Sequence, residues 1–375
     1  MNASSARIAL VHDWLTGMRG GEKVLEVLCE LYPHAELFTL LHVPGSTSKT
    51  IERLPVHSSF IQHMPFARRL YRYYLPLFPL AIEQFDLDRF DLIVSTSHCA
   101  AKAVVKTGRS RHLCYCFTPM RYAWDQFDAY FGQDRFGEFR SQLMRYMMKL
   151  VRHWDASTSR RVDRYVAISQ YVADRINKYY GRTTTIIHPP VNTDFYFPDH
   201  RKPGNAFLVV SALVPYKRID LAIEACRLAR VSLRIVGDGP ELNRLKKIAG
   251  PSVEFLGTVS DETIRELYRE TVALLLPGEE DFGIVPVEAQ ACGRPVIALG
   301  RGGACETVIH GVNGLLVSKP TPEAFANSLK TIGEYSFDSI KIRKYALRFS
   351  RTRFIAAIQA CVTETLETPK ETARW

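Results

Sequence analysis

Short apolar runs alternate with amphipathic stretches along the C-terminal half of the chain. The apolar runs are hydrophobic at successive positions, which is typical of strands buried on both faces. The stretches between them carry apolar residues at helical spacing, and Asp261 stands where it would cap one of these helices. The pattern predicts strands at 206–211, 232–236, 253–256, 272–276 and 295–299, and helices at 219–229, 241–248, 261–268, after 283 and from 305. Such alternation predicts a parallel sheet covered by helices on both faces.

The N-terminal half follows the same rhythm less regularly. It predicts strands at 8–11, 90–95, 112–117 and 164–169, with helices at 22–31 and from 170 to 179. The prolines and glycine that follow residue 188 indicate the end of this domain and a linker. We therefore expect an α/β protein of two Rossmann-like, doubly wound parallel-sheet domains, 1–200 and 201–350, facing a cleft that holds the ligand. A last helix, about 351–368, is expected to pack back on the first domain.

Composition favours a globular enzyme, with 46% hydrophobic and 23% charged residues. The first residues lack the pattern of a signal peptide, and no apolar run approaches the ~20 residues of a membrane span. The eight cysteines are scattered, which favours reduced thiols in a cytoplasmic protein over a disulfide framework.

The net charge of +10 is concentrated in one region. Residues 60–185 hold 20 lysines and arginines against 11 acidic residues. A basic surface of this kind attracts nucleic acid, anionic lipid or phosphorylated substrates, and charge alone does not choose among them.

The segment 277–293 combines acidic residues with a helix start. An apolar strand ends, a loop carries acids that include Glu280, and Pro286 falls in the first helical turn. The backbone N–H groups of Gly283, Ile284 and Val285 then lie at a helix N-terminus, where a phosphate binds well. Glu288 follows about one turn later, where an acid can receive ribose hydroxyls. Acids at such a position also serve simply as helix caps.

The order of motifs decides between these interpretations. Glu280 and Glu288, separated by seven residues with Phe282-Gly283 between them, resemble the signature of retaining GT-B glycosyltransferases of the family 4 type. Further segments match that family in order and spacing: Ile187-His-Pro-Pro-Val-Asn-Thr-Asp, Ser211-Ala-Leu-Val-Pro-Tyr-Lys-Arg, Val236-Gly-Asp-Gly-Pro-Glu-Leu, Phe255-Leu-Gly-Thr-Val-Ser-Asp, Gly302-Gly-Ala-Cys-Glu-Thr-Val and Gly311-Val-Asn-Gly-Leu-Leu-Val.

The resemblance implies a nucleotide-sugar donor and assigns roles. Glu280 would approach the donor sugar as a catalytic residue, and Glu288 would bind the ribose. Lys217 matches the family's phosphate-binding lysine, whereas Ala212 stands where the family has an arginine. Arg218 compensates for that arginine, or the pyrophosphate is held with one cation fewer.

We expect neither a cofactor nor a metal. Cations and a helix dipole can stabilise the leaving nucleotide without a metal ion. No Asp-x-Asp metal motif stands at the end of a predicted strand: Asp86-Leu-Asp88 precedes its strand, as a surface turn would.

In the N-terminal half, Gly20 and Gly21 follow the first predicted strand and open a helix. The resemblance implies that they let the backbone approach the donor phosphates or the acceptor, while a simple strand-to-helix turn is the alternative. His98 is placed like a family histidine near the sugar, although a lone histidine often has only a structural role.

The segment 116–125 resembles the branch of bacterial O-antigen and exopolysaccharide mannosyltransferases. Tyr122 and Trp124 offer flat faces for sugar rings, and Arg121 and Asp125 can bind hydroxyls or an acceptor phosphate. Relatives often carry histidine where this chain has Phe117. A packed aromatic loop is the competing interpretation.

Segments 64–79 and 140–164 mix cations with aromatic and aliphatic residues. This composition suits peripheral contact with an anionic membrane, and no RNA-binding module accompanies it, so no nucleic-acid partner is expected. The hypothesis is a retaining transferase that moves a hexose, mannose from GDP-mannose, to a lipid-linked oligosaccharide at the inner face of the cytoplasmic membrane. A nucleotide-sugar epimerase or hydrolase of the same fold, or a non-catalytic interaction protein, are the alternatives.

Overall fold

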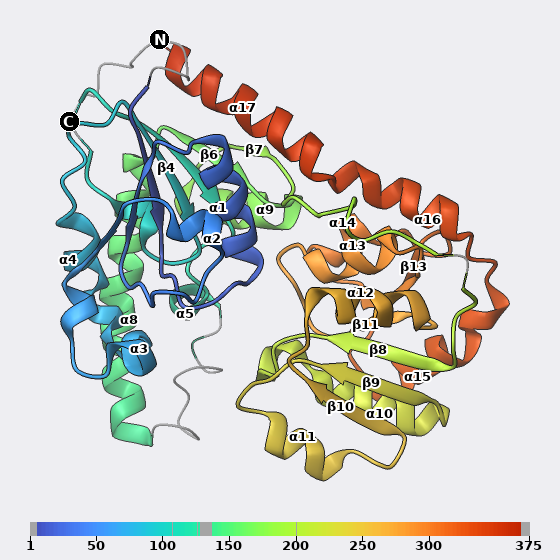
Figure 1. Cartoon of the computed structure of the whole chain (residues 1–375). Helices are drawn as coiled ribbons and strands as arrows, with labels where there is room; N and C mark the ends of the chain where they lie inside the picture. Colours follow the sequence, from blue (N-terminus) through green and yellow to red (C-terminus); the bar gives the residue numbers. More distant parts are fainter. Residues whose placement is uncertain (1–5, 107, 126, 128–136, 200, 369–375) are drawn as a thin grey trace. The chain divides into compact units, whose positions relative to one another are not determined.

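The computed structural model describes residues 6–368 except 107, 126, 128–136 and 200 (Figure 1). The chain divides into two compact units. The first comprises the chain up to Pro190 together with the segment from Phe354 onward, and the second comprises Val191–Arg353. The division therefore falls within the predicted linker, about ten residues before the domain boundary predicted after residue 200.

The first unit is built on a seven-stranded sheet in the order β3-β2-β1-β4-β5-β6-β7, in which neighbouring strands run parallel. Its strands are β1 (Ile8–His12), β2 (Glu36–Thr39), β3 (Val56–Ser58), β4 (Leu92–Ser97), β5 (Arg111–Cys116), β6 (Arg164–Ala167) and β7 (Thr184–Ile186). Its α-helices are α1 (Gly20–Leu31), α2 (Lys49–Glu52), α3 (Ala67–Leu70), α4 (Phe78–Glu83), α5 (Arg121–Trp124), α8 (Glu138–Thr158), α9 (Gln170–Tyr180) and, from Phe354, α17 (Arg351–Glu367). Short 3-10 helices are η1 (Phe60–His63), η2 (Tyr71–Leu77), η3 (Ala101–Ala103) and η4 (Ser159–Arg161).

The second unit has a six-stranded sheet in the order β10-β9-β8-β11-β12-β13, again parallel. Its strands are β8 (Ala206–Val210), β9 (Ser232–Val236), β10 (Val253–Gly257), β11 (Leu274–Leu276), β12 (Val296–Leu299) and β13 (Gly314–Val317). Its helices are η5 (Pro215–Lys217), α10 (Ile219–Ala229), α11 (Leu242–Ile248), α12 (Asp261–Glu270), α13 (Ile284–Ala291), α14 (Ala304–Thr307), α15 (Pro322–Thr331), η6 (Ile332–Glu334), α16 (Ser339–Ala346) and η7 (Leu347–Phe349).

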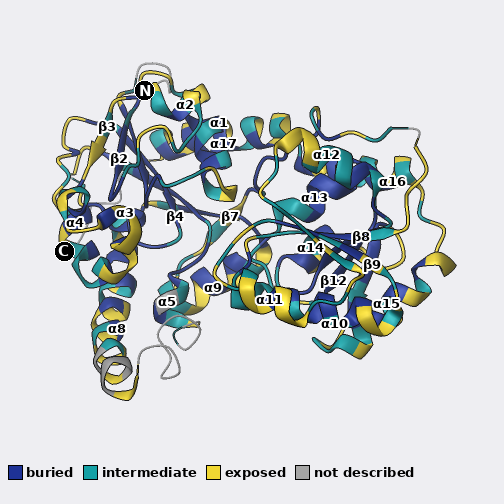
Figure 2. Ribbon diagram, turned by 60° about the horizontal axis from the view of Figure 1, so that its bottom comes forward, coloured by how far each residue is buried: buried dark blue, intermediate teal, exposed yellow. Residues whose placement is uncertain are grey.

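The central strands are buried on both faces, as their uninterrupted apolar sequences require. In β8, Phe207 and Val209 face one way, into a core shared with α10 and α15, and Leu208 between them is equally buried. Successive side chains of a strand point to opposite faces, so both faces must be covered. Figure 1 shows α10 and α15 on one side of this sheet and α12 and α13 on the other, and Figure 2 shows the strands in the buried colour. Two doubly wound parallel-sheet domains are the GT-B arrangement that the sequence predicts.

The structure corrects several local predictions. The strand expected at 90–95 lies at Leu92–Ser97, and β2, β3, β7 and β13 were not predicted. The helix α12 is capped by Ser260, whose side chain accepts from the Thr263 N–H, whereas Asp261 is its first helical residue. Both positions hold residues that cap well, and the extended backbone of Ser260 (ψ 160°) makes it the cap.

The helix α17 returns to the first unit, as the sequence suggested. The ring of Phe354 packs edge-on against Tyr115 of β5, with ring centroids 5.7 Å apart. Further along the helix, Glu364 forms an ion pair with Arg164 of β6. Residues 354–367 thus cover part of the first sheet with a segment that is distant in sequence.

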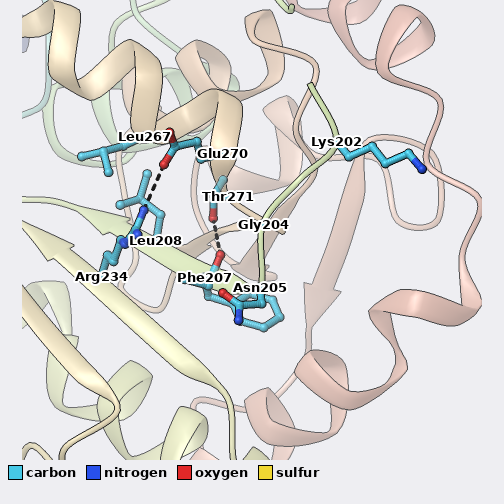
Figure 3. A pocket seen from close by; sticks show the side chains of 10 residues that line it. Lys202, Gly204, Asn205, Phe207, Leu208, Arg234, Leu267, Glu270 and Thr271 are labelled. Atoms are coloured by element: carbon cyan, nitrogen blue, oxygen red, sulfur yellow. Dashed lines mark hydrogen bonds and ion pairs between the residues drawn. The ribbon is translucent and has the colours of Figure 1, made fainter. Parts of the chain in front are cut away.

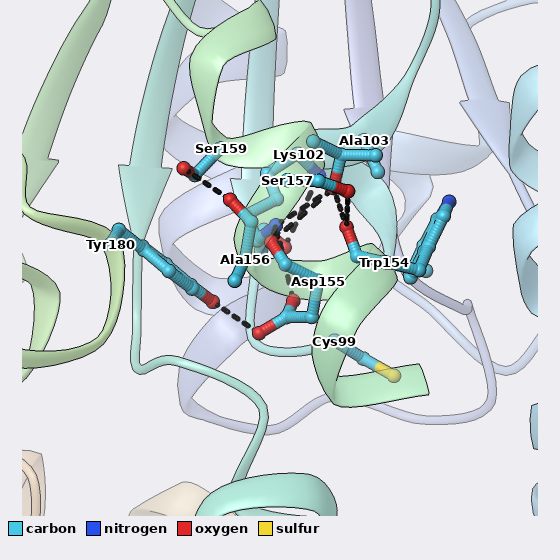
Figure 4. Close-up of polar contacts among 12 residues, drawn as sticks. Cys99, Lys102, Ala103, Trp154, Asp155, Ala156, Ser157, Ser159 and Tyr180 are labelled. Carbon is cyan, nitrogen blue, oxygen red and sulfur yellow. Dashed lines mark hydrogen bonds and ion pairs between the residues drawn. The ribbon is translucent and has the colours of Figure 1, made fainter. Parts of the chain in front are cut away.

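A buried ion pair ties four elements of the first unit together (Figure 4). The Lys102 ammonium in η3 lies 3.1 Å from Oδ1 of Asp155 in α8, and both side chains are almost wholly buried. The other carboxylate oxygen accepts from Trp124 Nε1 at 2.7 Å and from the Tyr180 hydroxyl at 2.8 Å. Lys102 also donates to the Asp155 carbonyl, so both charges are hydrogen-bonded as burial demands.

Candidate active site

In each sheet, the chain first adds strands on one side of the starting strand and then returns to add the remaining strands on its other side. In the second unit, β8 is flanked by β9 on one side and β11 on the other, so the crossovers diverge between β8 and β11. In the first unit they diverge between β1 and β4. Parallel α/β sheets bind ligands at the carboxyl ends of the strands beside such a point. The polar side chains after β8 and β11, and after β1 and β4, are therefore the candidates.

Lys217 and Glu280 meet at this point in the second unit. The Lys217 ammonium, after β8, pairs with Oε1 of Glu280, after β11, and the two side chains are 18% and 17% exposed. Gly278 allows the two loops to approach, because a Cβ there would lie 2.7 Å from the Tyr216 carbonyl oxygen and 2.9 Å from Lys217 Cα. The sequence predicted both residues as donor-site residues, and the structure brings them together.

The turn after β12 fixes the same loop from the other side. Gly303 donates its N–H to the Glu280 carbonyl at 2.8 Å, and Gly302 has φ +63°, in the left-handed region. A Cβ on Gly303 would stand 2.3 Å from Phe282 Cα. Three loops from three strand ends are thus packed backbone against backbone, which explains the Gly-Gly motif.

Glu288 lies on α13 beneath this loop and is 4% exposed. Its Oε2 accepts a hydrogen bond of 2.9 Å from the Tyr268 hydroxyl of α12. Tyr268 is wholly buried, and its ring packs against Tyr196. Burial, followed by the nearby Glu288 carboxylate, raises the pKa of Tyr268 well above its usual value, so the hydroxyl remains a donor. Tyr268 was not predicted, because nothing in its own neighbourhood distinguishes it from a core tyrosine.

The helix α13 begins where the sequence predicts a helix N-terminus. Gly283 is the N-cap residue at φ +86°, and the helix begins at Ile284 followed by Val285. The N–H groups of a first helical turn have no acceptor within the helix.

Arg218 does not join the Lys217–Glu280 pair. It adopts the left-handed conformation at φ +53°, and its Nε lies 3.3 Å from Oδ1 of Asp220. Ala212 lies in the loop after β8, whose backbone presses on Gly237 and Gly239. A Cβ at Gly237 would lie 1.9 Å from the Ser211 carbonyl oxygen, which accounts for the Gly-Asp-Gly-Pro motif.

At the switch point of the first unit, Asp13 anchors the segment after β4. This carboxylate is fully buried and accepts four backbone N–H bonds of 2.6–3.0 Å, from His98, Cys99, Ala100 and Ala101. Its Oδ2 also lies 3.1 Å from Nδ1 of His98, whose side chain is 29% exposed. Burial lowers the pKa of His98, while Asp13 acts in the opposite direction.

A second histidine, His12, lies behind His98. Its Nδ1 is 2.7 Å from the Thr96 hydroxyl, and its buried Nε2 has no hydrogen-bond partner among the described residues. Oε1 of Glu22 is 3.9 Å from that Nε2. Burial is the largest single influence and raises the pKa of Glu22, but His12, a backbone hydrogen bond and His98 together lower that pKa overall.

Gly21 borders this cluster, and Gly20 is the first residue of α1. A Cβ on Gly21 would lie 3.3 Å from the ring of Phe117 and 3.6 Å from His12. The sequence predicted site residues in the glycine loop and at His98, but it did not predict that His12, Asp13 and Glu22 lie beside them. The signal available was a His-Asp pair at the end of the first strand.

The segment 121–125 is held by the protein itself. Trp124 stacks on Tyr179 with centroids 4.5 Å apart, and the Arg152 guanidinium lies 5.2 Å from the Trp124 ring centre. Asp125 pairs with Arg175 and accepts from the Tyr179 hydroxyl. These contacts favour the packed-loop interpretation for Trp124 and Asp125. Arg121 begins α5 and is half-buried, and the side chain of Tyr122 lies outside the described residues.

A pocket of about 170 Å³ opens elsewhere in the second unit, at the amino end of β8 (Figure 3). Arg234 and Glu270 line it and pair with each other at 3.1 Å, and the Thr271 hydroxyl donates to the Ala206 carbonyl. Because Lys217 and Glu280 follow the carboxyl ends of the strands, this pocket is separate from them.

Within the described ranges, no group of three or more His, Cys, Asp or Glu residues could hold a metal ion. In the same part of the chain, no helix combines the length and the apolar character that crossing a membrane needs.

Two family models match the chain, and together they extend from residue 18 to residue 347. Glycosyltransferase Family 4 matches residues 18–195, and Glycosyl transferases group 1 matches residues 192–347. The chain belongs to the family 4-type glycosyltransferases.

Individual relatives of this glycosyltransferase are distant. An uncharacterized glycosyltransferase of Methanocaldococcus jannaschii is 26% identical over 54% of the chain and 60% of its own length. A D-inositol 3-phosphate glycosyltransferase of Streptomyces bingchenggensis is 32% identical over 44% of each chain. The chain thus spans about half the length of the curated relatives it matches.

Solved structures show the same fold over nearly the whole chain. Anabaena HepE in complex with UDP has a TM-score of 0.68 at 20% identity, and covers 96% of this glycosyltransferase and 99% of HepE. Sucrose-phosphate synthase from Thermosynechococcus elongatus has a TM-score of 0.72 at 17% identity, with 96% and 98% covered.

Proposed function

We propose that this glycosyltransferase moves a hexose from a nucleotide-sugar donor to an acceptor hydroxyl, with retention of configuration and without a metal ion. The observation that carries the proposal is the meeting of Lys217 and Glu280 at the switch point of the second unit, with Glu288 beneath them. HepE, a protein of the same fold, has been crystallised with UDP-glucose, which supports a nucleotide-sugar donor.

The donor diphosphate fits the positive groups at this point. The Lys217 ammonium can exchange Glu280 for a phosphate oxygen, and the N–H groups at the start of α13 add further donors. Both stabilise the negative charge that develops as the nucleotide leaves. Glu280, released from Lys217, then orients the sugar, and Glu288 receives the ribose hydroxyls.

We propose that the donor is GDP-mannose, from which mannose is transferred. We propose that the acceptor is a lipid-linked oligosaccharide of bacterial surface polysaccharide synthesis. The resemblance of segment 116–125 to bacterial mannosyltransferases supports the sugar. The relatives' names point to other acceptors, such as inositol phosphate, so donor and acceptor panels must include these alternatives.

The test uses purified full-length chain, a panel of GDP-, UDP- and ADP-sugars, and lipid-linked and inositol phosphate acceptors. We expect transfer from GDP-mannose, and a loss of about 100-fold or more in both Lys217→Ala and Glu280→Gln. Lys202→Ala, an exposed lysine of the same unit, is the matched control and should retain full activity. Native rates in both site variants would refute the proposal. Turnover of donor without acceptor would instead indicate the epimerase or hydrolase.

A lipid-linked acceptor implies contact with a membrane, and the first unit has a suitable surface. On the neighbouring elements α3, η2 and α8, exposed cations alternate with exposed apolar residues. Figure 2 shows exposed positions along α3 and α8. Phe66, Tyr73 and Tyr146 are 78%, 53% and 60% exposed. The exposed cations among the described side chains include Arg68, Arg69, Arg72, Arg145 and Lys149. Such a surface attracts anionic headgroups and inserts aromatic rings at the interface.

Co-sedimentation with vesicles tests the membrane contact. We expect binding to vesicles that contain phosphatidylglycerol and little binding to pure phosphatidylcholine. The double variant Arg68→Glu/Arg69→Glu should release the protein. Lys246→Glu/Lys247→Glu, an equal charge change on exposed α11, should not. Equal loss in the two variants would show a non-specific charge effect and refute this surface.

A further inference from the structure

The carboxylate of Asp155 in α8 fixes the indole of Trp124 in α5. Its Oδ2 accepts a hydrogen bond of 2.7 Å from Trp124 Nε1 and one of 2.8 Å from the Tyr180 hydroxyl. Its Oδ1 lies 3.1 Å from the Lys102 ammonium (Figure 4). Burial, and then the Asp155 carboxylate, raise the pKa of Tyr180 well above its usual value, so this hydroxyl remains a donor. With partners on both oxygens, the carboxylate is fixed in orientation and directs the indole N–H.

The buried ion pair suits positioning better than stabilisation. The side chains of Lys102 and Asp155 are almost wholly buried. Removing two such charges from water costs about as much as their attraction returns, and apolar residues of similar volume often stabilise a core equally well. Apolar residues could not, however, set the direction of an indole N–H. A buried polar network does so, because few arrangements satisfy all its members.

Two arginines complete the attachment of α5. Arg152 of α8 donates from Nε to the Ala123 carbonyl over 2.9 Å. Arg175 of α9 donates to the Pro119 carbonyl over 3.4 Å and pairs with Asp125. The segment is therefore held before α5, within it and after it by side chains of α8 and α9.

The attached segment leads directly from the ligand-binding edge of the first sheet. The strand β5 ends at Cys116, and the ring of the next residue, Phe117, lies 6.3 Å from that of His98 and 6.4 Å from that of His12. A short loop later, α5 begins at Arg121. Because parallel sheets bind ligands at the carboxyl ends of their strands, a shift of α5 would move Arg121 relative to that edge.

We propose that Asp155 is a positioning residue for acceptor recognition: it sets the place of α5, whose first residue, Arg121, binds the acceptor. A guanidinium can donate to sugar hydroxyls or to phosphate oxygens, and its contacts require a fixed geometry. Asp155 acts from within the core and does not touch the ligand. The inference rests on the proposed function for the acceptor, but not for the placement of α5.

The placement is tested without any substrate. Trp124→Phe removes the indole N–H, and Tyr180→Phe removes the second donor to the same carboxylate oxygen. In the full chain, each should speed amide hydrogen exchange in residues 119–125 about tenfold. Trp154→Phe is the matched control, because its Nε1 donates over 2.8 Å to a different carboxylate, that of Glu83, and it should leave this exchange unchanged. Native exchange in the first two variants, or equal acceleration in all three, would overturn the inference even if the protein proves to be an active transferase.

The role in transfer is tested by separating acceptor from donor. With GDP-mannose and the lipid-linked oligosaccharide, Trp124→Phe and Tyr180→Phe should each raise the acceptor KM about tenfold, while the melting shift produced by GDP stays native. The double variant should raise the acceptor KM no more than Trp124→Phe alone, because Tyr180 reaches α5 through Asp155. Additive effects, or an equal loss of GDP binding, would contradict the positioning role.

The choice of variants keeps the two proposals separable. Asp155→Asn is avoided, because it would leave the buried Lys102 without a counter-charge and folding itself would suffer. If the native chain transfers no sugar, the proposed function fails together with the acceptor role. The exchange measurement still decides whether Asp155 places α5.

Discussion

Replacing Tyr268 by phenylalanine removes one hydroxyl and leaves the ring in place. The hydroxyl donates to Oε2 of Glu288 over 2.9 Å, and both side chains are buried. Because phenylalanine keeps the packing against Tyr196, the substitution opens almost no cavity. A hydrogen bond to a charged acceptor contributes about 1.5–3 kcal/mol, so we expect the second unit to lose that much stability.

The same substitution should weaken donor binding. Without the hydroxyl, the Glu288 side chain is held less firmly and must be ordered when the ribose binds. Each kcal/mol that this ordering costs weakens donor binding about fivefold. We expect the donor KM to rise about five- to tenfold with little change in kcat.

The assay must report on the second unit. Trp14, Trp124, Trp154 and Trp375 all lie outside Val191–Arg353, so tryptophan fluorescence does not follow its unfolding. Unfolding of the second unit can instead be followed by hydrogen exchange in urea, with mass spectrometry on peptides of α12 and α13.

Tyr345→Phe is the matched control for Tyr268→Phe. The Tyr345 hydroxyl donates to a neutral acceptor, the Glu306 carbonyl, over 2.8 Å, and its loss should cost about 0.5–1.5 kcal/mol. The reasoning is wrong if Tyr268→Phe destabilises no more than this control, or if the donor KM does not change.

Three further predictions concern other parts of the molecule. Gly303→Ala should raise the donor KM and lower the melting temperature, because the new Cβ would meet Phe282 Cα at 2.3 Å; a native donor titration would contradict the packing described. Burial, aided by Lys106, lowers the pKa of His112 to about 3 from 6.5, so the unfolded chain binds one more proton as the pH falls below about 6.5. The free energy of unfolding of the first unit should therefore fall by up to about 1.4 kcal/mol per pH unit between pH 6 and pH 4. Urea titrations at several pH values, followed by tryptophan fluorescence, should show that this free energy depends less steeply on pH in His112→Gln. Cys305 is exposed and the other seven cysteines are buried, so a thiol reagent should modify one thiol per native chain, and a nucleoside diphosphate should slow that reaction if the adjoining Gly-Gly turn borders the donor.

The sequence was most informative where the strands are apolar throughout. The strands of the second unit were predicted within two residues, except β13, which begins at a glycine and was noticed only as a motif. β2 and β3 were not predicted because they have only four and three residues, too few to show a pattern. In addition, β3 carries His57 and Ser58 on an exposed edge.

The residues of the candidate site also fall into those that the sequence predicts and those that it does not. Lys217, Glu280 and Glu288 could be found because each lies in a local motif. Asp13 was missed although it stands beside His12 at the end of the first strand, because its partners are backbone N–H groups about 85 residues away, and backbone amides leave no trace in a sequence.

The packing of Trp124 was equally invisible to sequence reasoning. Its partners come from α8 and α9, and only the fold reveals that its ring is already covered. An aromatic residue in a motif can therefore be judged a ligand platform only after its neighbours are known.

The return of α17 determines the order in which the molecule can be completed. Phe354, Ile358 and Val362 are buried in the first unit, yet they leave the ribosome only after all of residues 191–353. A chain that ends at residue 353 still holds every residue of the second unit, whereas its first unit is left with part of its apolar surface open. A released chain of this length should therefore be protease-resistant in its second half and sensitive in its first.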